Sequence, residues 1–321
     1  MGPAGQWLEV PMYRLLKGKF RDRIRLYADC HGGEALECLD EVLRSRAAVV
    51  DRGGAACGQD YFEDSAESPE SADDVRKQAR AMRSRGYTAL KFDLDVPGTT
   101  GSDPYNRCLS NTAIDRMVEL VGAARDAVGI EVDLALDCHW RYNVSDVLKA
   151  AHELEPFRLL WLEDPVPPGN VDALRAVSSR ANSPVATGEN LFLFLFAGFR
   201  EILQTHAIGI ATPDVQKVSG LSVTLQVAQF ADEHIIPIAP HHISSPVGTL
   251  AAGTSLRGNS EFFTPGISRC PCTLLERSGR CLERPLIQDG FIHLPERAGL
   301  GVRLNEEVAR QYARKSESFF Q

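Results

Sequence analysis

The strongest constraint on the fold is a repeated pattern of strand, turn and helix along the whole chain. Short apolar runs rich in β-branched residues recur, each followed by polar or Gly/Pro turn residues and then by a stretch with helical periodicity. Eight strands are expected, at 23–28, 88–92, 131–136, 159–162, 185–187, 208–212, 235–239 and 261–263. Helical patterns cover 72–84, 111–127, 144–153, 171–179, 194–204 and 222–233. This alternation is typical of βα units with parallel strands.

Eight βα units close most simply into an α/β fold of the TIM type, a (β/α)₈ barrel. An open doubly wound sheet is the competing architecture. Such sheets usually carry a glycine-rich first βα turn, and no GxGxxG pattern follows any of the expected strands. A chain of 321 residues with 44% hydrophobic content is long enough to bury the core of one large domain. We therefore favour the barrel.

Two segments interrupt the regular alternation. A helix-like stretch at 34–50 and a Gly-rich, acidic run lie between the first strand and the helix at 72. The run PGTTGSDPYNRCLS at 97–110 follows the second strand. We interpret both as long loops on the C-terminal side of the strands, where barrels build substrate sites. A disordered insertion is the alternative for the first.

Charge and cysteine content narrow the function classes. A formal net charge of −8 and a pI near 5.6 argue against a nucleic-acid or anionic-membrane partner and favour a small molecule. No apolar run approaches membrane-spanning length, and the first residues lack a secretory signal pattern, so a cytoplasmic chain is expected. None of the eight cysteines forms a paired CxxC zinc pattern, so reduced structural thiols are favoured.

Polar side chains stand at the C-terminal end of the expected strands. They are Lys91 and Asp93, Asp137 and His139, Glu163, Glu189, Asp214 and His241. From Asp137 to His241 the steps between strand ends are 26, 26, 25 and 27 residues. One βα unit with its connections runs to about 30 residues, so successive strand ends are expected to face one mouth.

Three acids on neighbouring strand ends, Asp137, Glu163 and Glu189, predict a metal site. They would converge closely, and their mutual repulsion is unfavourable unless a cation lies between them. Mg²⁺ is the natural ion because it prefers oxygen ligands. Each acid alone could be an ordinary surface carboxylate, and Glu163 with Asp164 could simply cap the next helix. The shared register favours the metal site.

Two histidines are expected on either side of this cavity. Asp214 and His241 come from successive strands, so the carboxylate can hold one imidazole nitrogen and leave the other free as a base. His139 lies two residues beyond Asp137 and therefore points to the same side of its strand. His242 is expected behind His241, because strand alternation sends it the other way.

Eight segments in chain order carry a resemblance to a known family. They are RDRIRLYA (21–28), ALKFD (89–93), LALDCHWRY (134–142), WLEDP (161–165), VATGEN (185–190), PDVQKVSGLS (213–222), IAPHHISSPVG (238–248) and AGLGVRLNEE (298–307). The chain resembles the enolase superfamily, and within it the mandelate racemase group, most closely the acid-sugar dehydratases of the galactonate dehydratase type. The resemblance implies a barrel domain and a Mg²⁺ cofactor.

The resemblance also implies a role for each site residue. Asp137, Glu163 and Glu189 would bind Mg²⁺, which stabilises an enediolate. His241, paired with Asp214, would remove the α proton of a sugar acid, and His139 would protonate the departing β-hydroxyl. The product would be a 2-keto-3-deoxy acid.

The second strand departs from the group's KxK pattern, because Lys91 is followed two residues later by Asp93 and not by a second lysine. This disfavours a racemase that uses a lysine there as one of two bases. Lys91 is still expected in the catalytic site, in contact with the substrate carboxylate or a metal ligand. Asp93, Glu261 and Trp140 are the expected substrate-binding residues.

Members of the family usually begin with an α+β capping domain, and residue 1 falls just before the segment that resembles the entry into the barrel. We expect an entry segment at 1–20, a barrel at 21–282 and, at 283–321, a C-terminal segment that packs near the capping domain in the family. The C-terminal strands would be exposed or would pack on another subunit of a homo-oligomer.

The leading hypothesis is Mg²⁺-dependent dehydration of an aldonate such as galactonate or gluconate. One alternative is a racemase or epimerase of a 2-hydroxy acid, in which His139 returns a proton to the opposite face. Another is a non-catalytic, metal-binding remnant of the family. Product analysis separates the enzymes, and binding without turnover would identify the remnant.

Overall fold

The computed structural model describes residues 2–16, 18, 21–30, 71–93, 107–191, 195–242, 246–256, 263–264 and 287–303. The expected loop at 31–71 apart from its last residue, most of the loop at 97–110, and Glu261 lie outside these residues. At the centre is a six-stranded sheet in the order β2-β3-β4-β5-β6-β7. The strands are Ala28–Cys30, Ala89–Asp93, Asp133–Asp137, Trp161–Glu163, Val185–Thr187 and Ile210–Ala211. Every neighbouring pair is parallel.

Further pairings extend this sheet toward a closed barrel. A parallel bridge joins Ala211 to Ile238, in the segment predicted as the seventh strand. β8 (Phe263–Thr264) pairs in parallel with β1 (Arg23–Leu26), which runs into β2 after Tyr27. The expected first strand is therefore divided at Tyr27 into two short strands. The α/β barrel of the TIM type is confirmed.

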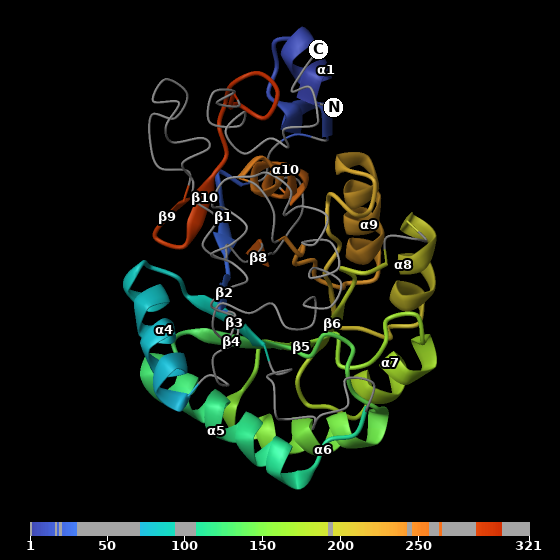
Figure 1. Cartoon of the computed structure of the whole chain (residues 1–321). Coiled ribbons are helices and arrows are strands. Elements are labelled where there is room, and N and C mark those ends of the chain that lie inside the picture. Colours follow the sequence, from blue (N-terminus) through green and yellow to red (C-terminus); the bar gives the residue numbers. More distant parts are fainter. Residues whose placement is uncertain are drawn as a thin grey trace, which may run out of the picture.

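Helices form the outer layer around the strands (Figure 1). They are α4 (Ala72–Ser84), α5 (Asn111–Val128), α6 (Val144–Leu154), α7 (Val171–Ser178), α8 (Leu195–Gln204) and α9 (Leu221–Glu233). Side-chain caps fix the starts of α4, α6 and α7 where the sequence patterns predict them: Ser71 and Asp74 form a capping box, and Asn143 and Asn170 cap α6 and α7. α10 (Pro246–Leu256) was not predicted, because PVGTLAAGTSL has no apolar stripe at helical spacing.

The inside of the barrel is filled by a layer of apolar side chains contributed by successive strands. The layer consists of Tyr27, Ala89, Ala135, Trp161, Ala186, Ile210 and Ala239. Four alanines leave room for the two large rings of Tyr27 and Trp161, which pack edge to face with centroids 5.3 Å apart. This layer closes the barrel below the site and excludes water from it.

The N-terminal segment and the segment around Gly299 lie together at one side of the barrel (Figure 1). Helix α1 (Gly2–Trp7) and the 3₁₀ turn η1 (Met12–Leu16) precede β1. The Met12 N–H donates to the Gly299 carbonyl over 2.7 Å. The hairpin of β9 (Ile287–Gln288) and β10 (Phe291–His293) pairs antiparallel with β1. The domain limits at residues 20 and 282 stay predictions.

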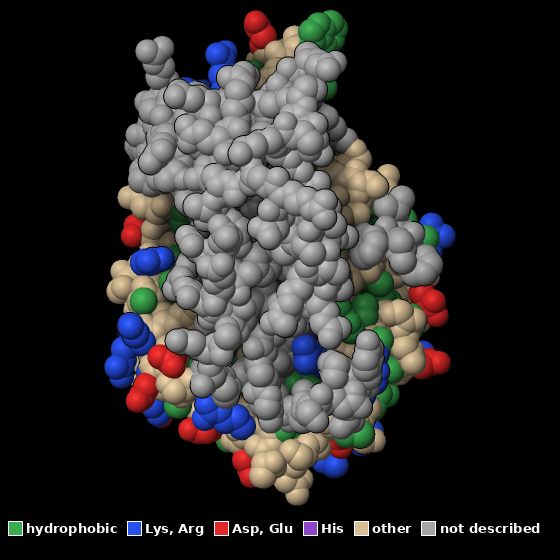
Figure 2. Space-filling model, in the orientation of Figure 1, with side chains coloured by type: hydrophobic (Ala, Val, Ile, Leu, Met, Phe, Trp, Pro, Cys, Tyr) green, Lys and Arg blue, Asp and Glu red, His purple; other side chains and the backbone are tan. Residues whose placement is uncertain are grey.

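The described surface carries both signs of charge. Figure 2 shows basic and acidic side chains interspersed around the rim of one face, among the residues that the structure describes. Within that same part of the chain, no helix combines the length and apolar character that crossing a membrane requires.

Candidate active site

The site begins one layer above the apolar floor of the barrel. Side chains that point inward repeat every second residue, so the next inward residue lies two positions beyond each floor residue. These residues are Asp29, Lys91, Asp137, Glu163, Gly188, Thr212 and His241, and all but the glycine are buried side chains with polar groups. The strand pattern thus stacks a charged layer directly on an apolar one.

Glu189 enters this layer because the alternation breaks at Gly188. Gly188 has a φ of 148°, and a Cβ there would lie 2.7 Å from the ring of Phe199. Only glycine fits both the conformation and the space, so the chain turns one residue early. The carboxylate of Glu189 then reaches the interior in place of a side chain at 188.

Three carboxylates meet at the centre of the mouth. Asp137, Glu163 and Glu189 each offer a ligand atom within 4.8 Å of the others, and all three are buried. Asp137 and Glu163 are directly paired in the register of β4 and β5. The buried Oε1 of Glu163 has no hydrogen-bond partner among the described residues. An unsatisfied buried carboxylate oxygen beside two others fits a hard divalent cation.

A second group shares Asp137 with this one. Asp93, Asp137 and His139 also bring ligand atoms within 4.8 Å of one another. Because this set contains an imidazole, it suits Mg²⁺ less well than the all-oxygen set does. The donor chemistry of Asp137, Glu163 and Glu189 therefore fits a hard divalent cation better than that of the second group does.

Lys91 lies between two of the acids. Its Nζ is 2.6 Å from Asp137 Oδ2 and 3.3 Å from Glu163 Oε2. Burial opposes its charge, but Asp137, Asp29 and Glu163 outweigh burial and raise the pKa of Lys91 well above its usual value. The ammonium group is therefore charged, and it offsets part of the negative charge of the cluster.

The acids differ in how readily they ionise. Burial raises the pKa of Glu163 to about 7, although Lys91 acts in the opposite direction. Burial also disfavours charge on Glu189, but His241 outweighs burial and holds the pKa of Glu189 well below its usual value. Of these two acids, Glu189 is therefore the one that ionises more readily.

His241 and Asp214 form the expected dyad. His241 Nδ1 lies 3.0 Å from Asp214 Oδ2, and Nε2 lies 2.8 Å from Glu189 Oε2. The backbone N–H of Gln216 donates to Asp214 Oδ1 over 2.8 Å and fixes this carboxylate. Burial disfavours the charged imidazole, but Glu189 and Asp214 together raise the pKa of His241 to about 9.

His139 lies at the other side of the carboxylates. Its Nε2 is 3.9 Å from Asp137 Oδ2, and its side chain is mostly buried. The ring of the half-buried Trp140 packs edge-on against it, with centroids 6.1 Å apart. His139 stands beside the β4 acid and His241 beside the acid that follows β6. One imidazole thus flanks the acids on each side.

Comparison with known proteins identifies the family. The family model described as "Enolase C-terminal domain-like" matches residues 74–308. The chain belongs to this enolase-like family. The enolase-like chain is 34% identical over 324 residues to a D-xylonate dehydratase of Haloferax volcanii, an alignment that covers 99% of this chain and 68% of the relative.

The chain is also similar to a second curated dehydratase and to a solved structure. A D-gluconate dehydratase of Thermoproteus tenax is 26% identical, and the alignment covers 95% of this chain and 52% of the relative. A mandelate racemase/muconate lactonizing enzyme-like protein from Rubrobacter xylanophilus has a similar structure, with a TM-score of 0.82 and 35% identity over 99% of this chain and 75% of that one. The enolase-like chain thus spans about half to three quarters of these proteins.

Sequence reasoning missed several residues of the enolase-like site. Trp161 donates its indole N–H to Glu163 Oε2 over 3.0 Å. Asp29 lies buried on the first strand and raises the pKa of Lys91. Both follow from strand alternation, since Trp161 is two residues before Glu163 and Asp29 pairs in register with Lys91. Counting by two from the predicted ligands would have found them.

One alternative weighed from the sequence is wrong. Glu163 and Asp164 do not cap the following helix, because Asn170 is the N-cap of α7. Both side chains are fully buried, and the hydroxyl of Thr187 donates to Asp164 Oδ1. The predicted substrate contact at Glu261 lies outside the described residues.

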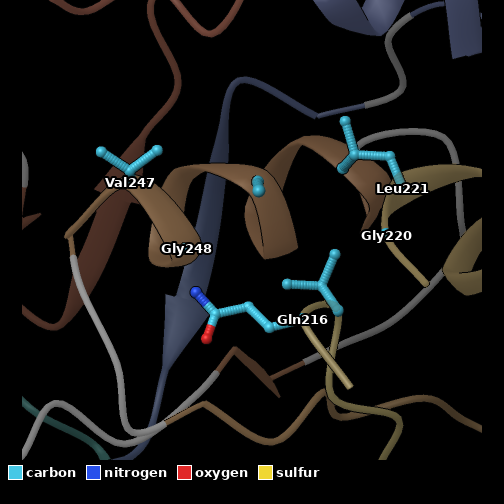
Figure 3. A pocket seen from close by; sticks show the side chains of 7 residues that line it. Gln216, Gly220, Leu221, Val247 and Gly248 are labelled. Carbon is cyan, nitrogen blue, oxygen red and sulfur yellow. The ribbon is translucent and has the colours of Figure 1, made fainter. Parts of the chain in front are cut away.

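A pocket of about 290 Å³ adjoins the dyad (Figure 3). It is lined by Val215, Gln216, Gly220, Leu221, Val247, Gly248 and Ala251. Its walls are the turn after β7 and helix α10, and Gln216 extends between them (Figure 3). Because Val215 directly follows Asp214, the pocket lies at the mouth end of the barrel.

Proposed function

We propose that this chain is a Mg²⁺-dependent dehydratase that converts an aldonate sugar acid, such as galactonate or gluconate, into a 2-keto-3-deoxy acid. The observation that carries the proposal is the buried group of three acids with a histidine on each side. Relatives named D-xylonate and D-gluconate dehydratase support the same class of reaction and extend the substrates to be tested to xylonate.

Asp137, Glu163 and Glu189 would hold the metal ion. The unpartnered Oε1 of Glu163 supports this assignment, because a buried carboxylate oxygen without a donor is costly. When bound, the ion supplies positive charge to the substrate carboxylate, which gains a second negative charge as the α proton leaves. Enolase-superfamily sites are known to combine Mg²⁺ with a lysine or histidine base.

His241 is the proposed base. Asp214 binds Nδ1, so the nitrogen proposed to take the α proton is Nε2, which lies 2.8 Å from the proposed metal ligand Glu189. His241 must be uncharged before the reaction. Once it has taken the proton, Asp214 and Glu189 stabilise the imidazolium at hydrogen-bond distance. The dyad therefore favours the state that follows proton removal.

His139 is the proposed acid. As the α C–H bond breaks, its electron pair forms a carbon–carbon double bond and the β C–O bond breaks. His139 gives its proton to the departing hydroxyl, which leaves as water. The enol that remains takes a proton at the β carbon and becomes the 2-keto-3-deoxy acid. Asp93 and Trp140, beside His139, are proposed to contact the substrate, as is Glu261.

The test is product formation from galactonate, gluconate, xylonate and a panel of aldaric acids, with and without Mg²⁺. The purified chain should form a 2-keto acid only with Mg²⁺, and His241→Asn should reduce its rate by about 10²–10⁴-fold. An epimer of unchanged composition would instead identify an epimerase. Mg²⁺ binding without any product would contradict the proposed activity.

A further inference from the structure

We propose that Arg107 and Asp164 are positioning residues that hold a strained turn, His139–Trp140, and thereby aim the imidazole of His139 at the substrate. The inference rests on the proposed function only for the role of His139 as the acid. The turn itself, and the residues that hold it, are features of the structure.

The turn is conformationally unfavourable on its own. His139 has a φ of 43° and Trp140 a φ of 51°, so two successive residues with side chains occupy the left-handed region. Each such residue costs about 1–2 kcal/mol relative to ordinary backbone. Surrounding contacts must therefore impose this geometry, and the structure shows which contacts do so.

Hydrogen bonds fix the turn from three sides. The His139 N–H donates to Asp137 Oδ1 over 3.0 Å, which ties the turn to a proposed metal ligand. The Trp140 N–H donates to the Asp164 carbonyl over 2.6 Å. Arg107 Nη1 donates to the Trp140 carbonyl over 2.7 Å. Removing one of these bonds leaves the strain in place with less to offset it.

Asp164 is itself held rigidly. It has a φ of 39°, its side chain is fully buried, and the Thr187 hydroxyl donates to its Oδ1. Its N–H donates to the Ala186 carbonyl over 2.9 Å. The carbonyl that receives the Trp140 N–H is thus fixed by contacts with the β6 strand.

The side chain of Arg107 is exposed, but its backbone is held by hydrogen bonds. Both the backbone N–H and the side-chain amide of Asn143 donate to the Arg107 carbonyl, over 3.0 and 2.8 Å. Asn143 is also the N-cap of α6. The Arg107 guanidinium therefore reaches the turn from a fixed point on the chain segment that precedes α5, and it links two neighbouring βα connections.

Loss of this support should uncouple two steps of the reaction. Without a well-placed His139, His241 can still remove the α proton, and the proton can return from solvent. In D₂O the substrate then gains deuterium without losing its hydroxyl. Arg107→Met should lower the ratio of elimination to α-proton exchange by about 10–100-fold, because small displacements of a reacting group carry costs of that size. His139→Asn should lower it further.

Two variants control this measurement. Arg107→Lys keeps a donor and should restore part of the ratio. Arg175→Met removes an exposed arginine whose ion pair with Asp172 lies within α7, and should leave the ratio unchanged. An unchanged ratio in Arg107→Met, whether or not both rates fall, would overturn the proposal.

A readout without turnover separates this inference from the proposed function. In protein with ¹⁵N-labelled histidine, the signals absent from His139→Asn identify His139. These signals should shift in Arg107→Met and move back toward their original positions in Arg107→Lys, while the His241 signals stay in place. Unchanged His139 signals overturn the positioning role whatever the activity. A wild-type chain that forms no keto acid overturns the proposed function, and the spectra still decide on Arg107.

Discussion

Charged side chains are buried together at the mouth of the barrel, whereas the ion pair of Arg25 and Asp133 at the bottom is partly exposed. At the mouth, Asp137, Glu163 and Glu189 are buried together, and Lys91 contacts only two of them at salt-bridge distance. At the bottom, where the strands begin, a charged side chain can be partly exposed and hydrogen-bonded to several groups. Arg25, for example, donates to Asp133 Oδ2, Thr88 Oγ1 and the Thr88 carbonyl, each over 2.7 Å.

Left-handed backbone conformations occur at both ends of the barrel. Among the described residues, His139, Trp140 and Asp164 have positive φ angles at the mouth without being glycine. At the bottom, His206 and Ile235 also have positive φ angles, and Gly86 packs against the turn in which Asp289 has one. Strain is therefore common to both ends, whereas the buried charged side chains of the described residues lie at the mouth, where chemistry is proposed. Barrels generally divide activity and stability in this way.

The largest expected effect on activity is that of replacing Asp137 at the mouth. The same strand, β4, carries Asp133 at the bottom, which allows a matched comparison. Each pairs with a cation, Lys91 at 2.6 Å and Arg25 at 2.7 Å. Asp137→Asn should abolish the rise in melting temperature that Mg²⁺ produces and reduce keto-acid formation by about 10²–10³-fold or more.

Asp133→Asn is the matched control. Its ion pair is partly exposed, and such pairs contribute about 0–1 kcal/mol, so this variant should melt slightly earlier and keep its activity per folded molecule. Calorimetry with and without Mg²⁺, together with the keto-acid assay, measures both. Equal losses of activity in the two variants would contradict the division between mouth and bottom.

The sequence predicted the acids at the mouth because strand periodicity and parallel pairing are local rules. Once the strand ends were located, Asp137 and Glu163 had to face the same side, and the structure pairs them in register. Helix starts were predictable for a similar reason, since a cap such as Asn143 lies next to the helix that it begins.

Features that depend on distant residues could not be predicted. The left-handed turn at His139 depends on a hydrogen bond from Trp140 to Asp164, which comes from the next βα unit. The division of the first strand at Tyr27 depends on different partners on its two sides, and α10 lacks a helical apolar pattern. Local patterns carry no signal for such contacts.

A smaller effect is expected at Gly86, between α4 and β3. Gly86 has a φ of 86°, and a Cβ there would lie 2.6 Å from the Asp289 Cα. Gly86→Ala combines conformational strain with a backbone clash and should lower the free energy of unfolding by about 2–4 kcal/mol. Activity per folded molecule should be unchanged, because the contact lies at the bottom of the barrel.

Gly129→Ala is the control for Gly86→Ala. Gly129 also has a positive φ, 70°, but nothing lies within 4 Å of the position of its Cβ. Gly129 has a ψ of −177°, and Gly129→Ala should lose only the cost of this conformation, about 1–3 kcal/mol. Urea unfolding of both variants measures the difference, which isolates the packing of the β9–β10 turn. Equal destabilisation would show that this turn adds nothing.

The smallest expected effect is on the free energy of unfolding and concerns Asp146. This charged residue lies at the mouth end, and we expect it to stabilise the fold without taking part in the reaction. Asp146, in the first turn of α6, accepts hydrogen bonds from Lys149, Asn143 and the Leu109 N–H, over 2.8, 2.8 and 3.1 Å. The bonds from Lys149 and Asn143 hold the pKa of Asp146 below its usual value. The ionised carboxylate therefore stabilises the folded chain above the unfolded pKa of about 3.9, and this contribution disappears as pH falls through the folded pKa.

Asp146→Asn should lower the free energy of unfolding by about 1–2 kcal/mol at neutral pH, and the gap to wild type should close as the carboxylate becomes protonated. Urea midpoints across the acidic range measure this gap. Asp172→Asn, which removes only an exposed ion pair with Arg175, should change little at any pH. A gap that persists in acid would mean that Asp146 acts through packing and not through charge. A gap that closes would mean that the ionised carboxylate of Asp146, which accepts from the side-chain amide of Asn143, stabilises the folded chain through its charge.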